Sequence, residues 1–331
     1  MSRAKKFSYA LVPLLVLAAA GLHLGPTVLA GLLSYMILDV THRWLARRLT
    51  SELSRWLALV IFLVAATALG LMVARFIRSI IHTLPQIAST AIPKLIVLSE
   101  SHGINLPFDN VYELREIAIH EIKDNAEAIT KTSGVLTVRF FHILIAVFVA
   151  MLAFFSRPRE DYEANFFDDL RRELGARMKT LMRGLEKILG AQVIIAAAYT
   201  VMTLLFLLVM GFSHVIFLTL ATFLFGVMPV IGNIISNAII VAAGLTLSTR
   251  HAIFALVFLI FIHKSGYLVY GRVLGASMKL PMWQTLLAIL LGEVVLGVPG
   301  IILAPTLLHY AREELRSIPA GNTAKAQVGP A

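Results

Sequence analysis

The stretch that decides the fold is residues 225–237, FGVMPVIGNIISN, which interrupts an otherwise apolar part of the chain. An apolar run begins at Val215 before this stretch, and another continues to Leu247 after it. Proline removes a helical hydrogen-bond donor, and glycine permits a tight reversal of the backbone. We therefore predict that a membrane helix breaks at Pro229 and Gly232.

The composition is that of a membrane protein with several spans. Hydrophobic residues make up 58% of the 331 residues and charged residues 15%, which is unusual for a soluble domain. Because hydrocarbon offers backbone polar groups no partner, and the apolar runs show no alternation of polar residues, the predicted fold class is all-α with about eight transmembrane helices. The apolar runs lie near residues 7–24, 26–41, 56–80, 134–155, 188–211, 213–229, 251–270 and 282–298.

The net charge of +10 reflects membrane topology rather than nucleic-acid binding. Basic residues gather at 2–6, 43–55, 157–187 and 312–316, which all fall on one side of the membrane if the spans alternate. By the positive-inside rule this side is the cytoplasm, so both termini are predicted to be cytoplasmic. The first span could alternatively be a signal peptide, but the second span that follows it at once favours a helical hairpin.

Changes in composition divide the chain into five predicted parts. They are N-terminal transmembrane helices at 1–80, an external helical insertion at 81–133, a fourth span and a basic amphipathic helix at 134–187, a C-terminal core at 188–316, and a disordered tail at 317–331.

Two of these parts carry further predictions. In the insertion, Pro85, Pro93 and Pro107 are expected to separate two helical stretches, the second at 110–131. In the basic helix, which begins near residues 156–161, an apolar stripe from Phe167 to Ile188 is surrounded by cations that include Arg177. Such a helix is expected to lie among lipid headgroups and to bind anionic lipid.

A second interruption, LGVPG at residues 296–300, resembles the first. Paired breaks in two parts of a membrane protein point to the substrate site of a transporter, although proline kinks can also be purely structural. The predicted backbone breaks are Pro229, Gly232, Gly297, Pro299 and Gly300. The predicted substrate or ion ligands beside them are Asn233, Ser236, Asn237 and Glu293.

Glu293 is the clearest ionisable residue within an apolar run, where a charge is costly. It is either a proton or cation site or a structural acid paired with Arg272 or Lys279. Gln192 is predicted to bridge helices, and His309 to be a packing residue whose polar atoms are satisfied.

No sequence motif indicates a cofactor, a metal or an enzyme. The chain lacks a phosphate-binding GxxxxGK[ST] loop, an HExxH or Cys/His cluster, and a GxSxG nucleophile elbow. An ATPase or a metalloenzyme is therefore not expected.

Four motifs carry a resemblance to a known family. They are GAQ at 190–192, PVIGN at 229–233, GRVLG at 271–275 followed by Leu280 and Pro281, and GVPGIILAP at 297–305. Their order, together with the polar insertion and the basic helix, resembles the AI-2E transporters, also known as the autoinducer-2 exporter family or PerM-like permeases. The resemblance covers nearly the whole chain.

The resemblance implies a homo-oligomeric permease of the bacterial inner membrane that moves small molecules or ions without ATP, as an exporter in some relatives. The sequence HKSGY at 263–267, with Gly271, stands where relatives carry a Gln/Glu-Gly-Asn cluster and a proline. Glu293 stands where small residues are usual in the family.

The predicted function is therefore a secondary transporter or facilitated exporter whose substrate passes between the two breaks. The alternative is a passive oligomeric channel or a membrane scaffold. An intramembrane enzyme is disfavoured, because no nucleophile and base occur together.

The predicted topology can be tested with epitope tags at the two termini. Because the basic segments of the chain mark the cytoplasmic side, both tags should become accessible only after the inner membrane is permeabilised. A C-terminal tag that antibodies reach from the outside of intact spheroplasts would contradict this topology.

Overall fold

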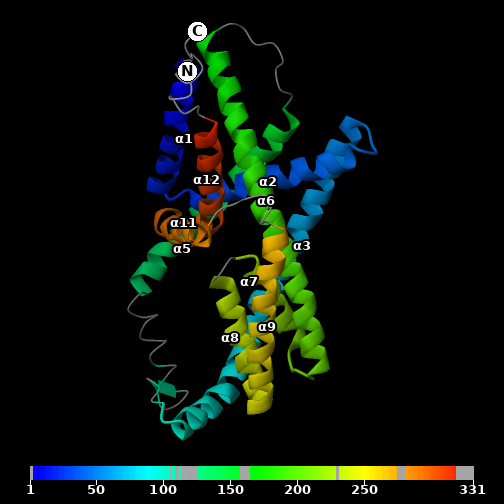
Figure 1. Cartoon of the computed structure of the whole chain (residues 1–331), viewed down its shortest axis with the longest axis vertical. Helices are drawn as coiled ribbons and strands as arrows, with labels where there is room; N and C mark the ends of the chain where they lie inside the picture. The colour runs from blue at the N-terminus through cyan, green and yellow to red at the C-terminus, as the bar shows by residue number, and fades with distance from the viewer. Residues whose placement is uncertain are drawn as a thin grey trace, which may run out of the picture. The chain divides into compact units, whose positions relative to one another are not determined.

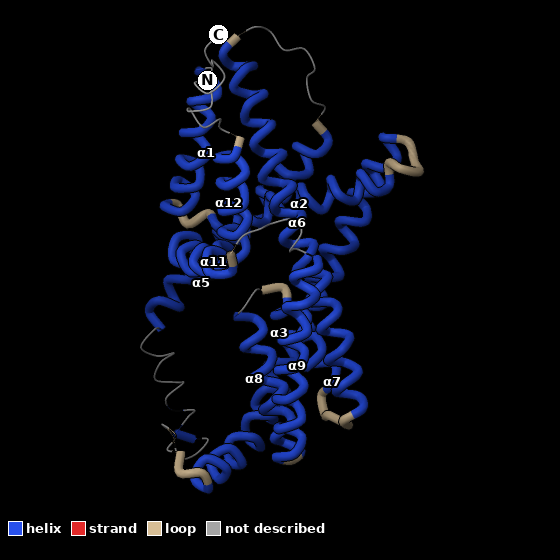
Figure 2. Tube along the Cα trace, in the orientation of Figure 1, coloured by secondary structure: helices blue, strands red, loops and turns tan. Residues whose placement is uncertain are grey.

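The computed structural model describes residues 3–104, 106, 108, 112, 113, 116, 126–156, 165–228, 231–273 and 281–317. All the regular elements in this part of the chain are helices (Figures 1 and 2). They are α1 (Arg3–Gly21), α2 (Gly25–Leu45), α3 (Ser51–Ser101), α5 (Ala126–Phe155), α6 (Phe166–Val209), α7 (Val215–Gly226), α8 (Ile231–Leu247), α9 (Thr249–Val273), α11 (Met282–Leu296) and α12 (Val298–Arg316).

Four of the described helices contain a segment long and apolar enough to cross a membrane, which identifies the chain as a helical membrane protein. They are α1, α3, α5 and α6. The described parts of four further apolar stretches, in α7, α8, α9 and α11, are shorter than 18 residues. The 12 residues of α7 extend only about 18 Å, well short of the hydrocarbon core of about 30 Å. The run at 213–229 therefore does not form the complete span that was predicted.

The prediction that Pro85 and Pro93 separate helical stretches is wrong. Both residues lie inside α3, which continues for 51 residues from Ser51 to Ser101. A proline removes one backbone hydrogen bond, but a helix with long runs on both sides can resume after it. The third span and the start of the predicted insertion are thus a single helix. Pro107, most of the second predicted stretch at 110–131, and the tail after Ser317 lie outside the described residues.

The basic amphipathic segment is the first half of α6 and not a separate helix, because it continues directly into the predicted fifth span. The helix continues for 44 residues from Phe166 to Val209, a length of about 66 Å. Its apolar second half accounts for about 30 Å, the thickness of a bilayer core. At its start, the side-chain oxygen of Asn165 accepts the backbone N–H of Asp168 at 2.8 Å, which caps the helix.

Contacts between residues group the chain into two compact units, and the segments of the two units alternate along the sequence. Unit 1 consists of Met1–Gly25, Pro158–Ile188 and Met278–Ala331, and unit 2 of Pro26–Arg157 and Leu189–Ser277. The first half of α6 belongs to unit 1 and its second half to unit 2.

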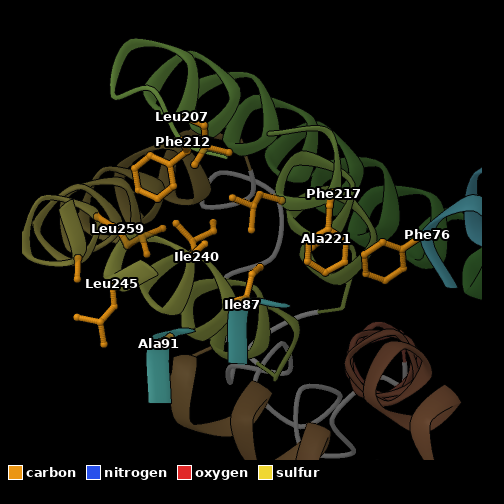
Figure 3. Close-up of a cluster of buried hydrophobic side chains, with 14 residues drawn as sticks. Phe76, Ile87, Ala91, Leu207, Phe212, Phe217, Ala221, Ile240, Leu245 and Leu259 are labelled. Atoms are coloured by element: carbon orange, nitrogen blue, oxygen red, sulfur yellow. The ribbon is translucent and has the colours of Figure 1, made fainter. Parts of the chain in front are cut away.

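The main apolar core of unit 2 lies among α3, α6, α7, α8 and α9 (Figure 3). Phe76 of α3 stacks on Phe217 of α7 with ring centroids 5.6 Å apart. Leu207 of α6 and Ile240 of α8 are fully buried in the same cluster. This core holds the two short helices α7 and α8 against longer ones. A second, smaller cluster joins α2, α3 and α5.

The polar centre of unit 1 is Arg177 of α6, which was predicted to be one of the cations around the apolar stripe. The Arg177 side chain is only 4% exposed. Its guanidinium group donates to Ser8 Oγ of α1 at 2.8 Å and to a carboxylate oxygen of Glu314 of α12 at 2.7 Å. It also lies 3.6 Å from the centre of the Tyr9 ring. A buried guanidinium is tolerated when it is paired and hydrogen-bonded in this way, so Arg177 joins three helices.

Each predicted break lies between two helices that pack against each other. Helices α7 and α8 flank Pro229, and α11 and α12 flank Gly297. In the second hairpin the two backbones touch at glycines. A Cβ on Gly300 would overlap the Gly292 carbonyl group, and a Cβ on Gly292 would lie 2.6 Å from the Gly300 carbonyl oxygen.

Replacing Gly300 with alanine should separate α11 from α12. Because the added methyl group meets rigid backbone, we expect the free energy of unfolding to fall by about 1–3 kcal/mol. Thermal unfolding of the protein in lipid nanodiscs measures the change. A Cβ on Gly175, in the exposed part of α6, would meet nothing within 4 Å. Gly175→Ala should therefore be neutral or stabilise by about 0.5–1 kcal/mol. Equal stability of the two variants would contradict the close contact.

Candidate functional site

The first hairpin turns immediately after Gly226, the last residue of α7. The N–H group of Met228 donates to the carbonyl oxygen of Phe225 at 2.8 Å, which closes a tight final turn. Helix α8 begins at Ile231. Pro229 lies between these two helix ends but outside the described residues. Its role as a break therefore remains a prediction.

Gly232 makes the hairpin narrow. It lies in the first turn of α8, where an added Cβ would overlap the carbonyl group of Phe225 and lie 3.1 Å from Cβ of Met228. Its φ is not in the left-handed region. Glycine is therefore needed here because the backbone approaches closely, and not because of an unusual backbone conformation.

Gln192 of α6 anchors the end of α7. Its side-chain amide donates to the carbonyl oxygen of Gly226 at 2.8 Å, and this hydrogen bond is buried. In an uninterrupted helix this carbonyl would accept the N–H of residue 230. Gly226 also packs on Ala196, where an added Cβ would lie 3.4 Å from the alanine Cβ. The prediction that Gln192 bridges helices is confirmed.

Of the three polar residues predicted as ligands in α8, two have side-chain amides that make no hydrogen bond with another described residue. Ser236 is only 2% exposed, and its hydroxyl donates to the carbonyl oxygen of Asn233 at 3.2 Å, within its own helix. Asn233 and Asn237 are half-buried, and their spacing of four residues puts them on one face of α8. Neither amide makes a side-chain hydrogen bond with another residue in the described part of the chain.

The second hairpin turns at Gly297, which has φ 68° and ψ −155°. Glycine is favoured there because this combination is strained for residues that carry a Cβ. Pro299 lies in the first turn of α12, where its missing N–H costs little. Pro299 therefore starts a helix rather than breaking one. The N–H groups of Gly297 and Gly300 donate to the carbonyl oxygens of Glu293 and Gly297, at 2.8 Å and 2.7 Å.

Glu293 lies in the last turn of α11, one turn before Gly297. Its side chain is exposed, and its neighbours Leu290, Leu291 and Val294 are exposed apolar residues. The side chains of its two predicted partners, Arg272 and Lys279, are outside the described residues. Both predicted roles of Glu293, as a proton or cation site and as a structural acid, remain open predictions.

The two hairpins belong to different units. Helices α7 and α8 lie in unit 2, and α11 and α12 lie in unit 1. The juxtaposition of the two breaks therefore remains a prediction.

One contact at the opposite end of α8 was not anticipated from the sequence. The ammonium group of Lys94 in α3 donates to the carbonyl oxygen of Thr246 at 2.6 Å. It caps the C-terminal end of α8, where a cation also interacts favourably with the helix dipole. No spacing rule connects residues 94 and 246, so only the fold reveals this contact.

The family model for the AI-2E family transporters matches residues 7–319, nearly the whole chain. In the comparison with curated proteins, no relative matches the chain. The polar insertion, the two breaks and the motifs around them all lie within the matched residues. The chain belongs to the AI-2E transporter family.

Proposed function

We propose that the chain is a secondary transporter that exports a small molecule or ion across the bacterial inner membrane without ATP. Membership of a transporter family supports the general activity. The observation that carries the proposal is the pair of half-buried amides, Asn233 and Asn237, directly after the turn of the first hairpin. Each amide offers one acceptor and two donors, and no described residue uses them.

The hairpin supplies further groups for a ligand. The first N–H groups of α8 have no partner within the helix, and the helix dipole makes its N-terminal end favourable for negative charge or for a carbonyl oxygen. Short helices that end inside membrane proteins use such termini to bind substrates. Asn233 and Asn237 would then select the substrate by hydrogen bonding.

Glu293 is the residue we propose for coupling to a proton or a cation. A carboxylate among apolar side chains of a membrane protein is costly and commonly serves an ion pathway. Its place beside the turn at Gly297 adds the backbone carbonyl groups at the end of α11 as possible cation ligands.

The placement in the membrane is part of the same proposal. The protein is inferred to be a multi-pass protein of the inner membrane with both termini in the cytoplasm, where the basic segments of the chain lie. Exposed cations on the first half of α6 support contact with anionic lipid. They are Arg171, Lys179, Arg183 and Lys187. A homo-oligomer is inferred from the family resemblance alone.

Substrate binding by the two amides can be tested in two steps. A thermal-shift screen of metabolites on the purified protein, repeated with and without sodium, provides a ligand. This ligand is then used in counterflow with proteoliposomes, where we expect saturable uptake. Each lost hydrogen bond is worth about 0.5–1.5 kcal/mol, so Asn233→Ala and Asn237→Ala should each weaken binding about 2- to 10-fold.

A control variant separates binding from stability. Asn165→Ser replaces an amide at the start of α6 with another capping residue, and it should bind the ligand as the wild type does. Unsaturable flux in all variants would support a passive channel, and no flux would support a scaffold.

Glu293→Gln should remove the pH or sodium dependence of flux, and an unchanged dependence would exclude Glu293 from coupling.

The anchor at Gln192 gives a separate prediction. Gln192→Leu leaves the buried carbonyl of Gly226 without a donor, which should cost about 1–3 kcal/mol of stability and reduce the maximal rate of counterflow. Gln192→Glu should retain the hydrogen bond only while its carboxyl group is protonated, so its stability should fall as the pH rises. Thr200→Ala is the matched control, because the Thr200 hydroxyl bonds within α6 itself. A Gln192→Leu protein that matches this control would contradict the anchoring role.

A further inference from the structure

His309 of α12 is a buried histidine that the proposed transport mechanism does not use. Only 6% of the residue is exposed. The imidazole lies directly on the backbone of α6 at Gly184, where an added Cβ would be 3.1 Å from His309 Cδ2 and 3.7 Å from Thr306 Cγ2. Glycine at position 184 therefore lets α12 approach α6 closely at His309 and Thr306.

The Nδ1 atom of His309 is buried and has no hydrogen-bond partner among the described residues. In the neutral ring this atom can carry a lone pair, and the cost is one unsatisfied acceptor. In the protonated ring both nitrogens carry hydrogens, so Nδ1 would become a charged donor with no acceptor. The contact between α6 and α12 therefore tolerates the neutral ring far better than the cation.

The charged groups around the ring reinforce this preference. Burial is the largest cause that lowers the pKa of His309 below its usual value. Glu313 of α12 raises the pKa, whereas Lys187 of α6 and Arg312 and Arg316 of α12 lower it. The effect of Glu313 on this pKa is reduced further, because its carboxylate forms an ion pair with Arg316. A carboxylate oxygen of Glu313 lies 3.6 Å from a guanidinium nitrogen of Arg316.

We propose that His309 makes the contact between α6 and α12 sensitive to pH, so that protonation of the buried imidazole separates α12 from α6. In the closed form α12 packs on α6 at His309, and in the open form the two helices are separated there. The open form exposes the ring to water, so His309 binds a proton with an ordinary pKa of about 6.5. In the closed form the buried ring binds the proton more weakly. The closed form therefore keeps its full stability above about pH 6.5 and loses stability as the pH falls from there towards its own lower pKa.

Next to this contact, Arg177 holds α12 through Glu314. The arginine stays ionised at every physiological pH, and a carboxylate ordinarily takes up a proton only at a lower pH than a histidine does. Acidification should therefore loosen the α6–α12 contact at His309 and Thr306 before it releases the ion pair. The outcome is a partial opening that exposes Gly184 and Thr306 while the end of α12 remains attached.

Because the chain contains no cysteine, a single introduced thiol can report this opening. Thr306→Cys places a near-isosteric thiol at a position that is 0% exposed, and Ser317→Cys places one at an exposed position. The full-length protein in nanodiscs is treated with a maleimide reagent at about pH 7.5 and about pH 5.5, on either side of the ordinary histidine pKa. At each pH the labelling rate of Thr306→Cys is divided by that of Ser317→Cys, and this ratio removes the effect of pH on the reagent.

We expect this ratio to rise on acidification, by up to about tenfold for each pKa unit that separates the open and closed forms. In a His309→Gln background the ratio should be the same at both pH values. A His23→Gln background, which changes an exposed histidine, should keep the full rise. A ratio that does not change in the wild-type background, or that still rises with His309→Gln, would overturn the proposal. The assay measures no transport, so its outcome does not depend on the proposed function.

Discussion

The carbonyl group of Gly226 sets the central constraint on unit 2. A helix that stops inside a membrane protein leaves backbone groups unpaired, and hydrocarbon offers them nothing. Here Gln192 supplies the missing donor from α6, and the missing side chain of Gly232 lets α8 return close to the end of α7. Because Gln192 pairs with the carbonyl group at the end of α7, the side-chain amides of Asn233 and Asn237 are not needed as donors to that carbonyl. Among the described residues, neither amide has a side-chain hydrogen-bond partner.

Unit 1 solves a similar problem with different chemistry. At its centre, one guanidinium group binds a hydroxyl, a carboxylate and an aromatic ring on two other helices. Such pairs depend on geometry, because a guanidinium that loses its partner in a buried position is strongly destabilising. The second hairpin in this unit relies on backbone contact between glycines. Both arrangements favour one defined packing over many approximate ones.

Sequence reasoning succeeded where a single residue type has a strong backbone effect. The hairpin turn at Gly297 follows from glycine chemistry, and the membrane class follows from composition. Predictions from the sequence failed where the outcome depends on which residues of other helices pack against a side chain. Pro85 and Pro93 were expected to interrupt helices, but α3 continues through both. Arg177 looks like its cationic neighbours in the sequence, and only the positions of Ser8 and Glu314 show that it is buried. For the same reason, Ser236 could not be distinguished from Asn233 and Asn237 until its hydroxyl was found to bond within α8.

The rotational setting of α6 has one more consequence. Arg177, Gly184 and Gln192 are separated by 7 and 8 residues, so on a helix with 3.6 residues per turn they fall within a sector of about 80° over about 22 Å. A screw motion that advanced α6 by a single residue would turn this sector by about 100°. The ion pair, the glycine contact and the anchor of α7 would then be lost together. A change in the register of α6 would therefore break attachments in both units.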